Sequence, residues 1–182
     1  EENLKRGIEM AGKESQRAFG DSRIYLEKFL DSPRHIEVQV LADTHGNYLH
    51  MGDRDCSLQR SHQKVLEEAP AINIDQDKKE DIYNKCLLAC KELNYESAGT
   101  FEFLYQDDIF YFIEMNTRIQ VEHPVTESIT GLDLVKLQIR IARNEALRIK
   151  QEDVSLSGHS IECRINAEHP RTFFPSPGKV LD

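Results

Sequence analysis

The 182-residue sequence predicts an α+β fold, a mainly antiparallel sheet with flanking helices. Two pairs of segments alternate apolar and polar residues across turn residues, as β-hairpins do: 35–41 with the segment from 48, and 100–105 with 110–116. Three other stretches, near 4–19, 75–94 and 133–141, carry apolar residues at helical spacing. The length suits one domain, or a large piece of one, with a sizeable core.

Composition excludes several classes of protein. A net charge of −9 argues against non-specific binding to nucleic acid or to anionic membranes. No long apolar run is present, so we expect no membrane span, and the charged start does not resemble a signal peptide. The cysteines form no CxxC pair, which indicates reduced core thiols in a cytoplasmic protein rather than disulfides or zinc ligands. They are Cys56, Cys86, Cys90 and Cys163.

The N-terminal stretch begins at Glu1 without Met, already inside a helical pattern, so we expect a piece of a longer protein. The apolar run Ile24–Leu30 predicts a strand that the charged pair Glu27 and Lys28 interrupts. That pair is either a chance surface feature or part of a site. Asp31-Ser32-Pro33 then ends the strand.

The next segments predict a hairpin followed by a loop. The strand 35–41, the turn 43–47 and a return strand from Tyr48 form the hairpin. His35, at the strand end, is most simply a solvated side chain. The stretch 54–70 has mixed charge and no clean period, which predicts a loop. Its few basic residues are flanked by acids without interleaved aromatics, so it lacks the stacking platform of a nucleic-acid site.

Two helices and a last strand complete the pattern. Asp75 is a good N-cap for a helix that runs to about Asn94. Its apolar face consists of Ile82, Cys86, Cys90 and Leu93. Asp133 caps the second helix, and the segment 159–165 alternates as a strand with Glu162 and Arg164 on one face.

A polar ribbon at 110–124 carries the chemistry. In an extended strand, one face would hold two carboxylates, two amides and a guanidinium: Glu114, Asn116, Arg118, Gln120 and Glu122. A three-residue loop at 107–109 would place Glu102 opposite Glu114, whereas a two-residue loop would shift the register by one. In the three-residue case, Phe101, Phe103 and Tyr105 would share the apolar face with Met115, Ile113 and Tyr111. Opposed like charges are destabilising, but Mg²⁺ is typically held by one or two carboxylates together with substrate phosphates. A half-buried strand with a solvated polar face is the alternative.

Two motifs resemble a known family. Glu102-Phe103 with EMNTRIQVEHPVTE at 114–127, and IECRINAE at 161–168, are similar to the signatures of biotin carboxylases. These are ATP-grasp enzymes, the carboxylating component of acetyl-CoA carboxylase, which serves fatty acid biosynthesis, and of its relatives. The resemblance implies the C-terminal half of an ATP-grasp fold. Residues 1–30 would end the lid subdomain and form the adenine hinge, 31–150 would be the catalytic subdomain, and 151–182 would begin the C-terminal region.

The resemblance also implies a reaction and its cofactors. Bicarbonate would attack Mg-ATP (or Mn-ATP) to give carboxyphosphate, whose CO₂ is captured by biotin on a carrier protein or domain. The implied metal ligands are Glu102, Glu114 and Asn116, and the implied nucleotide contacts are Glu27, Lys28, Leu30, His35, Gln59, His62 and Leu104. Lys64, Arg118, Gln120 and the Val121 backbone would hold bicarbonate, Glu122 would be the general base, and Arg164 would stabilise the biotin enolate. Ser61 stands where the family usually has a basic residue. The full-length parent would be a cytoplasmic homodimer.

Other functions remain open at this stage. Another ATP-grasp ligase, such as a carbamoyl-phosphate synthetase half, can share the Glu-x-Asn-x-Arg pattern, although the run from Gln120 to Pro124 favours biotin carboxylase. A non-catalytic nucleotide-binding module is a further alternative, because no glycine-rich phosphate loop is present. We therefore expect this stretch alone to be inactive. The acyl acceptor is not predicted, since a different domain selects it.

Overall fold

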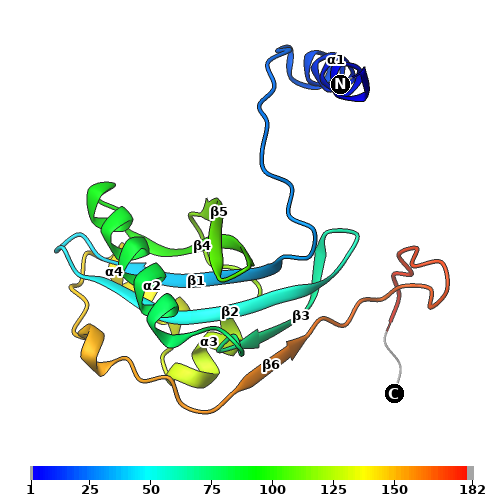
Figure 1. Cartoon of the computed structure of the whole chain (residues 1–182). Helices are drawn as coiled ribbons and strands as arrows, with labels where there is room; N and C mark the ends of the chain where they lie inside the picture. The colour runs from blue at the N-terminus through cyan, green and yellow to red at the C-terminus, as the bar shows by residue number, and fades with distance from the viewer. Residues whose placement is uncertain (1, 180–182) are drawn as a thin grey trace. The chain divides into compact units, whose positions relative to one another are not determined.

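The computed structural model describes residues 2–179 and divides into two compact units, the first ending at Asp31 and the second beginning at Ser32 (Figure 1). The first unit contains helix α1, Glu2–Phe19, as its apolar spacing predicts. The predicted strand Ile24–Leu30 is wrong, because this segment is irregular. Within the described part of this unit only a helix accompanies it, so its backbone has no neighbouring strand with which to pair.

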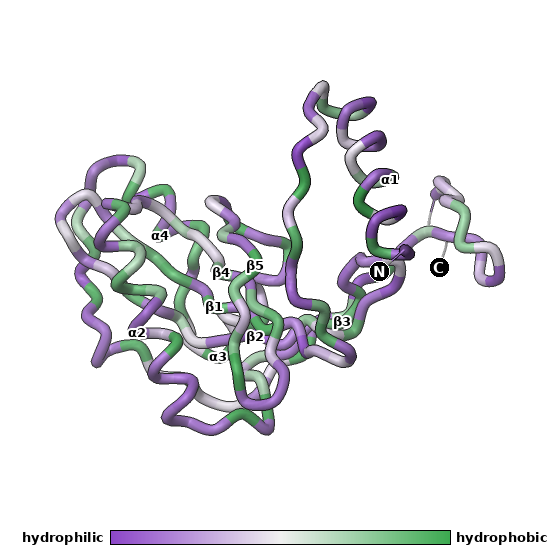
Figure 2. Tube along the Cα trace, turned by 45° about the horizontal axis from the view of Figure 1, so that its top comes forward, coloured by the Kyte–Doolittle hydropathy of each residue, from purple (hydrophilic) through white to green (hydrophobic). Residues whose placement is uncertain are grey.

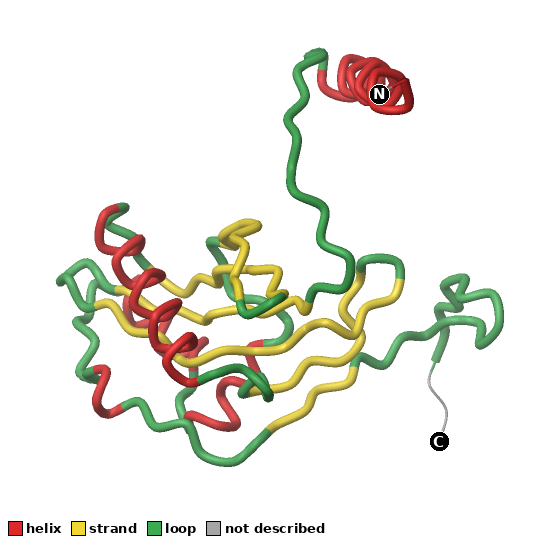
Figure 3. The backbone as a smooth tube through the Cα atoms, in the orientation of Figure 1, coloured by secondary structure: helices red, strands yellow, loops and turns green. Residues whose placement is uncertain are grey.

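The second unit is built on a six-stranded antiparallel sheet in the order β5-β4-β1-β2-β3-β6, which confirms the predicted α+β class (Figures 1 and 3). The strands are β1 Arg34–Ala42, β2 Tyr48–Arg60, β3 Gln63–Ala69, β4 Ser97–Gln106, β5 Ile109–Asn116 and β6 Ser160–Cys163. The helices are α2 Gln76–Glu92, α3 His123–Thr130 and α4 Leu134–Ala142, with a short 3₁₀ turn at Gln151–Asp153. Asp75 and Asp133 cap α2 and α4 as predicted.

Alternation along the strands separates two hydrophobic layers. Val38 and Val40 of β1 and Phe101 and Phe103 of β4 pack against α2, through Ile82, Tyr83, Cys86 and Cys90. Leu41, on the other face of β1, joins a second cluster with α4, formed by Leu134, Leu137 and Ile141. Leu93 is not part of the buried face, because it is the C-cap of α2 and is 67% exposed.

The β4–β5 hairpin reaches the predicted pairing by a different route. Its turn has two residues, Asp107 and Asp108, both with positive φ, so Gln106 pairs with Ile109 and the predicted three-residue loop is wrong. A β-bulge between Glu102 and Phe103 then restores the register, and Glu102 lies opposite Glu114 as predicted. Phe101 pairs with Met115 as predicted, but Phe103 and Tyr105 pair with Phe112 and Phe110, and Ile113 is the extra residue of the bulge.

The stretch 54–70, predicted to be a loop, is mainly the β2–β3 hairpin. Its turn is at Ser61 and His62, which both have positive φ. Charged residues hide the alternation, because Arg54 and Glu67 are fully buried and engaged in ion pairs. A pattern that counts only apolar residues as buried therefore misses these strands.

The polar ribbon leaves the sheet after Asn116, so the predicted continuous strand to Glu122 is wrong. A turn at Val121 and Glu122 leads into α3, which the sequence pattern did not predict. Pro124 lies in the first turn of α3, where its missing N–H has no helical partner to lose. Glu122 is thus the N-terminal flank of a helix.

Two predictions from composition can be compared with the structure. In the described part of the chain no helix is long and apolar enough to cross a membrane, and apolar stretches are short along the described trace (Figure 2). The described cysteines are free, but Cys163 is exposed on β6 and is not a core thiol. Cys56, Cys86 and Cys90 are buried as predicted.

Candidate functional site

A polar cavity of about 530 Å³ lies on the face of the sheet opposite α2. It is lined by β1, the β2–β3 hairpin, β4, β5, the 118–122 segment and the residues that follow β6. The lining residues are His35, Gln59, His62, Gln63, Lys64, Glu102, Glu114, Asn116, Arg118, Gln120, Val121, Glu122, Arg164 and Asn166. A larger apolar groove, between α2 and the β4–β5 hairpin, has no comparable set of converging polar groups. The predicted site residues of the second unit, Leu104 excepted, therefore meet in one cavity.

The three predicted metal ligands lie together at one side of this cavity. Asn116 Nδ2 donates to Glu102 Oε1 at 2.8 Å and to Glu114 Oε1 at 3.2 Å. Rotation of the Asn116 amide by half a turn would present its oxygen instead. Two carboxylates and an amide oxygen form a hard donor set that suits Mg²⁺ or Mn²⁺. The residues present therefore fit the metal that the resemblance implies.

Two further groups place possible ligand atoms within 4.8 Å of one another: His35, Glu37 and Glu102, and Glu37, Cys56 and Glu122. Both include Glu37, whose carboxylate is already held by Arg54 at 2.9 Å. Burial opposes ionisation of Glu37, but Arg54 and its other cationic neighbours hold its pKa well below the usual range. Because Arg54 already balances the negative charge of Glu37, this carboxylate is a poor ligand for a metal cation. We therefore favour the ligand set Glu102, Glu114 and Asn116.

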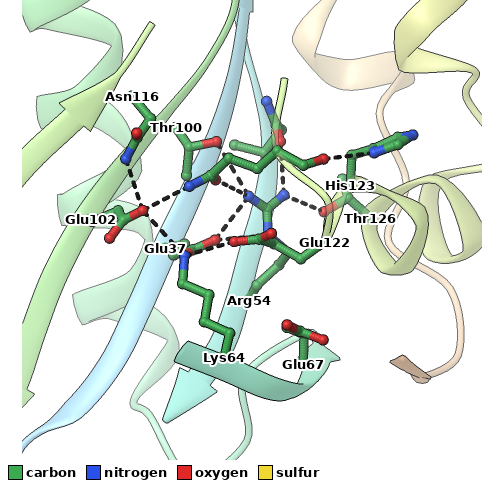
Figure 4. A network of polar contacts seen from close by, with 12 residues as sticks. Glu37, Arg54, Lys64, Glu67, Thr100, Glu102, Asn116, Glu122, His123 and Thr126 are labelled. Atoms are coloured by element: carbon green, nitrogen blue, oxygen red, sulfur yellow. Dashed lines mark hydrogen bonds and ion pairs between the residues drawn. The ribbon is translucent and has the colours of Figure 1, made fainter. Parts of the chain in front are cut away.

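Lys64 lies at the centre of the acidic side chains (Figure 4). Its Nζ is 2.6 Å from Glu122 Oε1 and 3.2 Å from Glu102 Oε1, and it also contacts Glu37. Burial disfavours the ammonium, but these carboxylates outweigh it and raise the pKa of Lys64 above its ordinary value. Lys64 is therefore a fixed positive charge inside the cavity.

Glu122 is 2% exposed and is held between two cations. Lys64 contacts Oε1, and Arg164 donates from NH2 to Oε2 at 2.9 Å. The guanidinium of Arg118 also lines the cavity but donates to the Ile119 carbonyl at 3.2 Å. The sequence placed Arg118 and Glu122 on one strand, whereas both lie in the segment between β5 and α3. Lys64 reaches the cavity from β3, and Arg164 directly follows β6.

Arg54 organises the cavity floor, and the sequence interpretation missed it. This fully buried side chain donates to Glu37 at 2.9 and 3.0 Å, to Gln39 at 2.7 Å, and to Gln120 and Thr126 at 3.0 Å (Figure 4). It therefore links β1, β2, α3 and the segment before α3. The sequence did contain a signal for this role: Arg54 lies in a segment long enough to form a strand. An arginine in a strand can be buried when acidic residues on neighbouring strands pair with it.

His35 is turned into the cavity rather than into solvent, so its interpretation as a solvated strand-end side chain is wrong. Its Nε2 lies 2.9 Å from Glu102 Oε2 and 3.3 Å from Glu37 Oε1. Burial opposes protonation, but these two carboxylates raise the pKa of His35 to about 9. His35 is thus a cation at neutral pH.

The remaining predicted nucleotide contacts are more dispersed. Gln59 and His62 line the cavity from the β2–β3 hairpin, and Leu104, opposite His35 in the ladder, lies outside the lining set. Glu27, Lys28 and Leu30 belong to the first unit.

Comparison with known proteins identifies the family. Residues 1–150 match the model of the carbamoyl-phosphate synthase L chain, ATP binding domain. The chain belongs to this family. The biotin carboxylase of Pseudomonas aeruginosa is 59% identical over 180 residues, which cover 99% of this chain and 40% of that protein. This confirms the resemblance that the motifs indicated.

Solved structures agree. A biotin carboxylase–β-γ-ATP complex from Campylobacter jejuni is similar with a TM-score of 0.89 and 50% identity, over 98% of this chain and 40% of that one. The biotin carboxylase domain dimer of Hydrogenobacter thermophilus 2-oxoglutarate carboxylase, in complex with MgADP, ADP and bicarbonate, has a TM-score of 0.87 at 50% identity, over 98% of this chain and 42% of that one. The chain thus spans about 40% of the length of the relatives it matches.

Proposed function

We propose that this chain is the central part of a biotin carboxylase, which carboxylates biotin on its carrier protein with bicarbonate and Mg-ATP. The observation that carries the proposal is Glu122, a buried carboxylate held between Lys64 and Arg164 in a cavity that also contains a metal-type donor set. Residues 1–30 would end the lid and hinge, 31–150 would form the catalytic subdomain, and 151–182 would begin the C-terminal region.

The nucleotide and metal occupy one side of the cavity in this proposal. Glu102, Glu114 and Asn116 hold Mg²⁺ or Mn²⁺, which neutralises the phosphate charge when it is bound. The proposed ATP contacts within the second unit are His35, Gln59, His62 and Leu104. Glu27, Lys28 and Leu30 are the nucleotide contacts that the family resemblance implies for the first unit. The charged His35 suits an electron-rich partner such as a ribose hydroxyl or a phosphate oxygen.

Bicarbonate occupies the other side. Arg118 and Lys64, with Gln120 and the Val121 backbone, hold the anion, and Glu122 takes its proton as the bicarbonate oxygen attacks the γ-phosphorus. The new P–O bond forms as the bond to ADP breaks, which gives carboxyphosphate. Since Lys64 and Arg164 already contact both oxygens of Glu122, the base is oriented before the substrate arrives.

Biotin and the carrier complete the proposal. Carboxyphosphate breaks down to CO₂ and inorganic phosphate, and the phosphate takes the proton of the biotin ring nitrogen. Arg164 stabilises the negative charge that this puts on the ureido oxygen, and the nitrogen then forms its bond to CO₂. The partners are bicarbonate and a biotin carboxyl carrier protein or domain, and the full-length protein forms a homodimer in the cytoplasm. Support comes from the names of the relatives and from the dimer seen for the Hydrogenobacter thermophilus domain.

Glu122→Gln in the full-length protein tests the proposed base. We expect bicarbonate-dependent ADP release to fall by at least about 10²-fold, the lower range for a general base, with Mg·ADP binding nearly unchanged. Glu92→Gln, at an exposed position on α2, is the matched control and should retain full activity. Undiminished turnover by the Glu122→Gln variant would place the base elsewhere, and a wild-type protein without bicarbonate-dependent ATP cleavage would refute the proposed function.

A further inference from the structure

Two buried glutamates face each other behind Arg164. Glu67 of β3 and Glu162 of β6 are direct partners in the antiparallel ladder. Side chains of such partners lie on the same face with Cβ atoms about 4.5–5.5 Å apart, where two like charges are destabilising. Glu67 has no exposed surface and Glu162 is half-buried, so water does little to screen the repulsion. This pair therefore requires a compensating group.

The hydrogen bonds leave one oxygen of each carboxyl unsatisfied. Arg164 Nε donates to Glu67 Oε1 at 2.7 Å. Among the described residues, Oε2 of Glu67 and Oε2 of Glu162 are buried without a hydrogen-bond partner. Buried acceptors without a donor are costly, and each such atom calls for an explanation. A single proton placed between the two carboxyls would make one oxygen a donor and satisfy the other.

The surrounding charges favour such a proton. Arg164 is already engaged with the catalytic candidate Glu122 at 2.9 Å, so two ionised glutamates would set three carboxylates around one guanidinium. The charged groups that face Glu67 are Arg164, Glu122 and Glu162. Those that face Glu162 are its ladder partner Glu67 together with Arg164, Glu122, His123 and Arg54. Burial raises the pKa of both glutamates, although Arg164 opposes the shift.

We propose that Glu67 and Glu162 share one proton at neutral pH and together present a single negative charge to Arg164. The O–H of one carboxyl donates to the carboxylate of the other, and no other bond changes. Glu67 and Glu162 are then positioning residues. They orient the Arg164 guanidinium through Glu67, and their single shared negative charge leaves part of its positive charge unbalanced and available to the cavity. The consequence for biotin rests on the proposed function, whereas the shared proton does not.

Two single variants and their combination test the idea in the full-length protein. In Glu67→Gln or Glu162→Gln the remaining carboxyl ionises and still balances Arg164, so we expect kcat/KM for free biotin to fall only a few-fold. The double variant removes the charge altogether. Its loss should exceed the product of the single losses by about tenfold, within the range measured for coupled neighbours. Glu68→Gln is the matched control, because Glu68 pairs with His159 and not with Arg164.

Carbon NMR of the glutamate carboxyl groups detects the proton without any turnover. In the wild-type protein we expect the pair to titrate in two separate steps. The upper step should lie well above the ordinary glutamate pKa of about 4.3, and the other step should lie at a lower pH than the upper one. In either single variant the surviving carboxyl should titrate below the upper wild-type value, because the repulsion between the two carboxyls is gone while burial remains. Two wild-type carboxyls that both ionise near the ordinary glutamate pKa, or single variants as impaired as the double, would overturn the proposal. Since the NMR titration requires only the wild-type fold, it decides the matter even if a variant fails to fold. It is also independent of whether the protein carboxylates biotin.

Discussion

Replacing Arg54 by Met should cost the second unit a large part of its stability. The substitution keeps the apolar stem but removes hydrogen bonds to Glu37, Gln39, Gln120 and Thr126. Glu37 has no exposed surface and would lose both hydrogen bonds that Arg54 donates to its Oε2. Removal of one partner from a buried ion pair costs about 3–5 kcal/mol. Because Lys64 and His35 remain beside Glu37, we place the loss near the lower limit, at about 3 kcal/mol.

Urea unfolding followed by far-ultraviolet circular dichroism measures this loss, since the chain has no tryptophan for fluorescence. The double variant Arg54→Met/Glu37→Gln removes the stranded charge, and we expect it to regain at least about 1 kcal/mol relative to Arg54→Met alone. A loss below about 1 kcal/mol for Arg54→Met, within the ordinary range of point substitutions, would refute the view that this arginine holds the cavity floor together.

Two other predictions concern pH and metal binding. Burial alone would favour protonation of Asp43, but hydrogen bonds from Asn47, Leu147 and His45 lower its pKa. Its contribution is therefore complete above the unfolded pKa of about 3.9 and is lost as pH falls through the lower folded pKa. Asp43→Asn should flatten this acid limb in a plot of unfolding free energy against pH, and an unchanged slope would contradict the assignment. Glu114→Gln in the full-length protein should weaken Mn²⁺ binding in the presence of ADP by at least about tenfold, as measured by titration calorimetry. Equal affinity would exclude Glu114 as a ligand.

The sequence predicted the hairpins and helices where local signals agree. Asp75 and Asp133 are effective N-caps in front of apolar helical faces, and both helices begin where these residues predict. The opposition of Glu102 and Glu114 was also correct, although the loop length assumed for it was not. A two-residue turn and a bulge together reproduce the register of a three-residue loop, and periodicity alone does not distinguish them.

The errors have two physical causes: charged residues that are buried in ion pairs, and a change in the direction of the chain where the sequence pattern continues. Arg54 and Glu67 are polar by type but buried by pairing, so the β2–β3 hairpin looked like a loop. Alternation also continues past Asn116 in the sequence, while the chain turns at Val121 to enter α3. The predicted site residues of the second unit, Leu104 excepted, nevertheless line one cavity, because the motif carries their chemistry whichever backbone shape presents them.

The bulge at Ile113 has a consequence for how this sheet edge tolerates change. The bulge lies between the Asp107–Asp108 turn and Glu114. The face of the sheet on which Glu114 lies is therefore fixed beside the bulge and does not depend on which side chains form the turn. Residues at the tip can be exchanged without rotating Glu114 away from Glu102. Deletion of Ile113 would remove only this extra residue, so Phe103–Phe112 and Glu102–Glu114 would become consecutive pairs of a regular ladder and the donor set would stay on the same face.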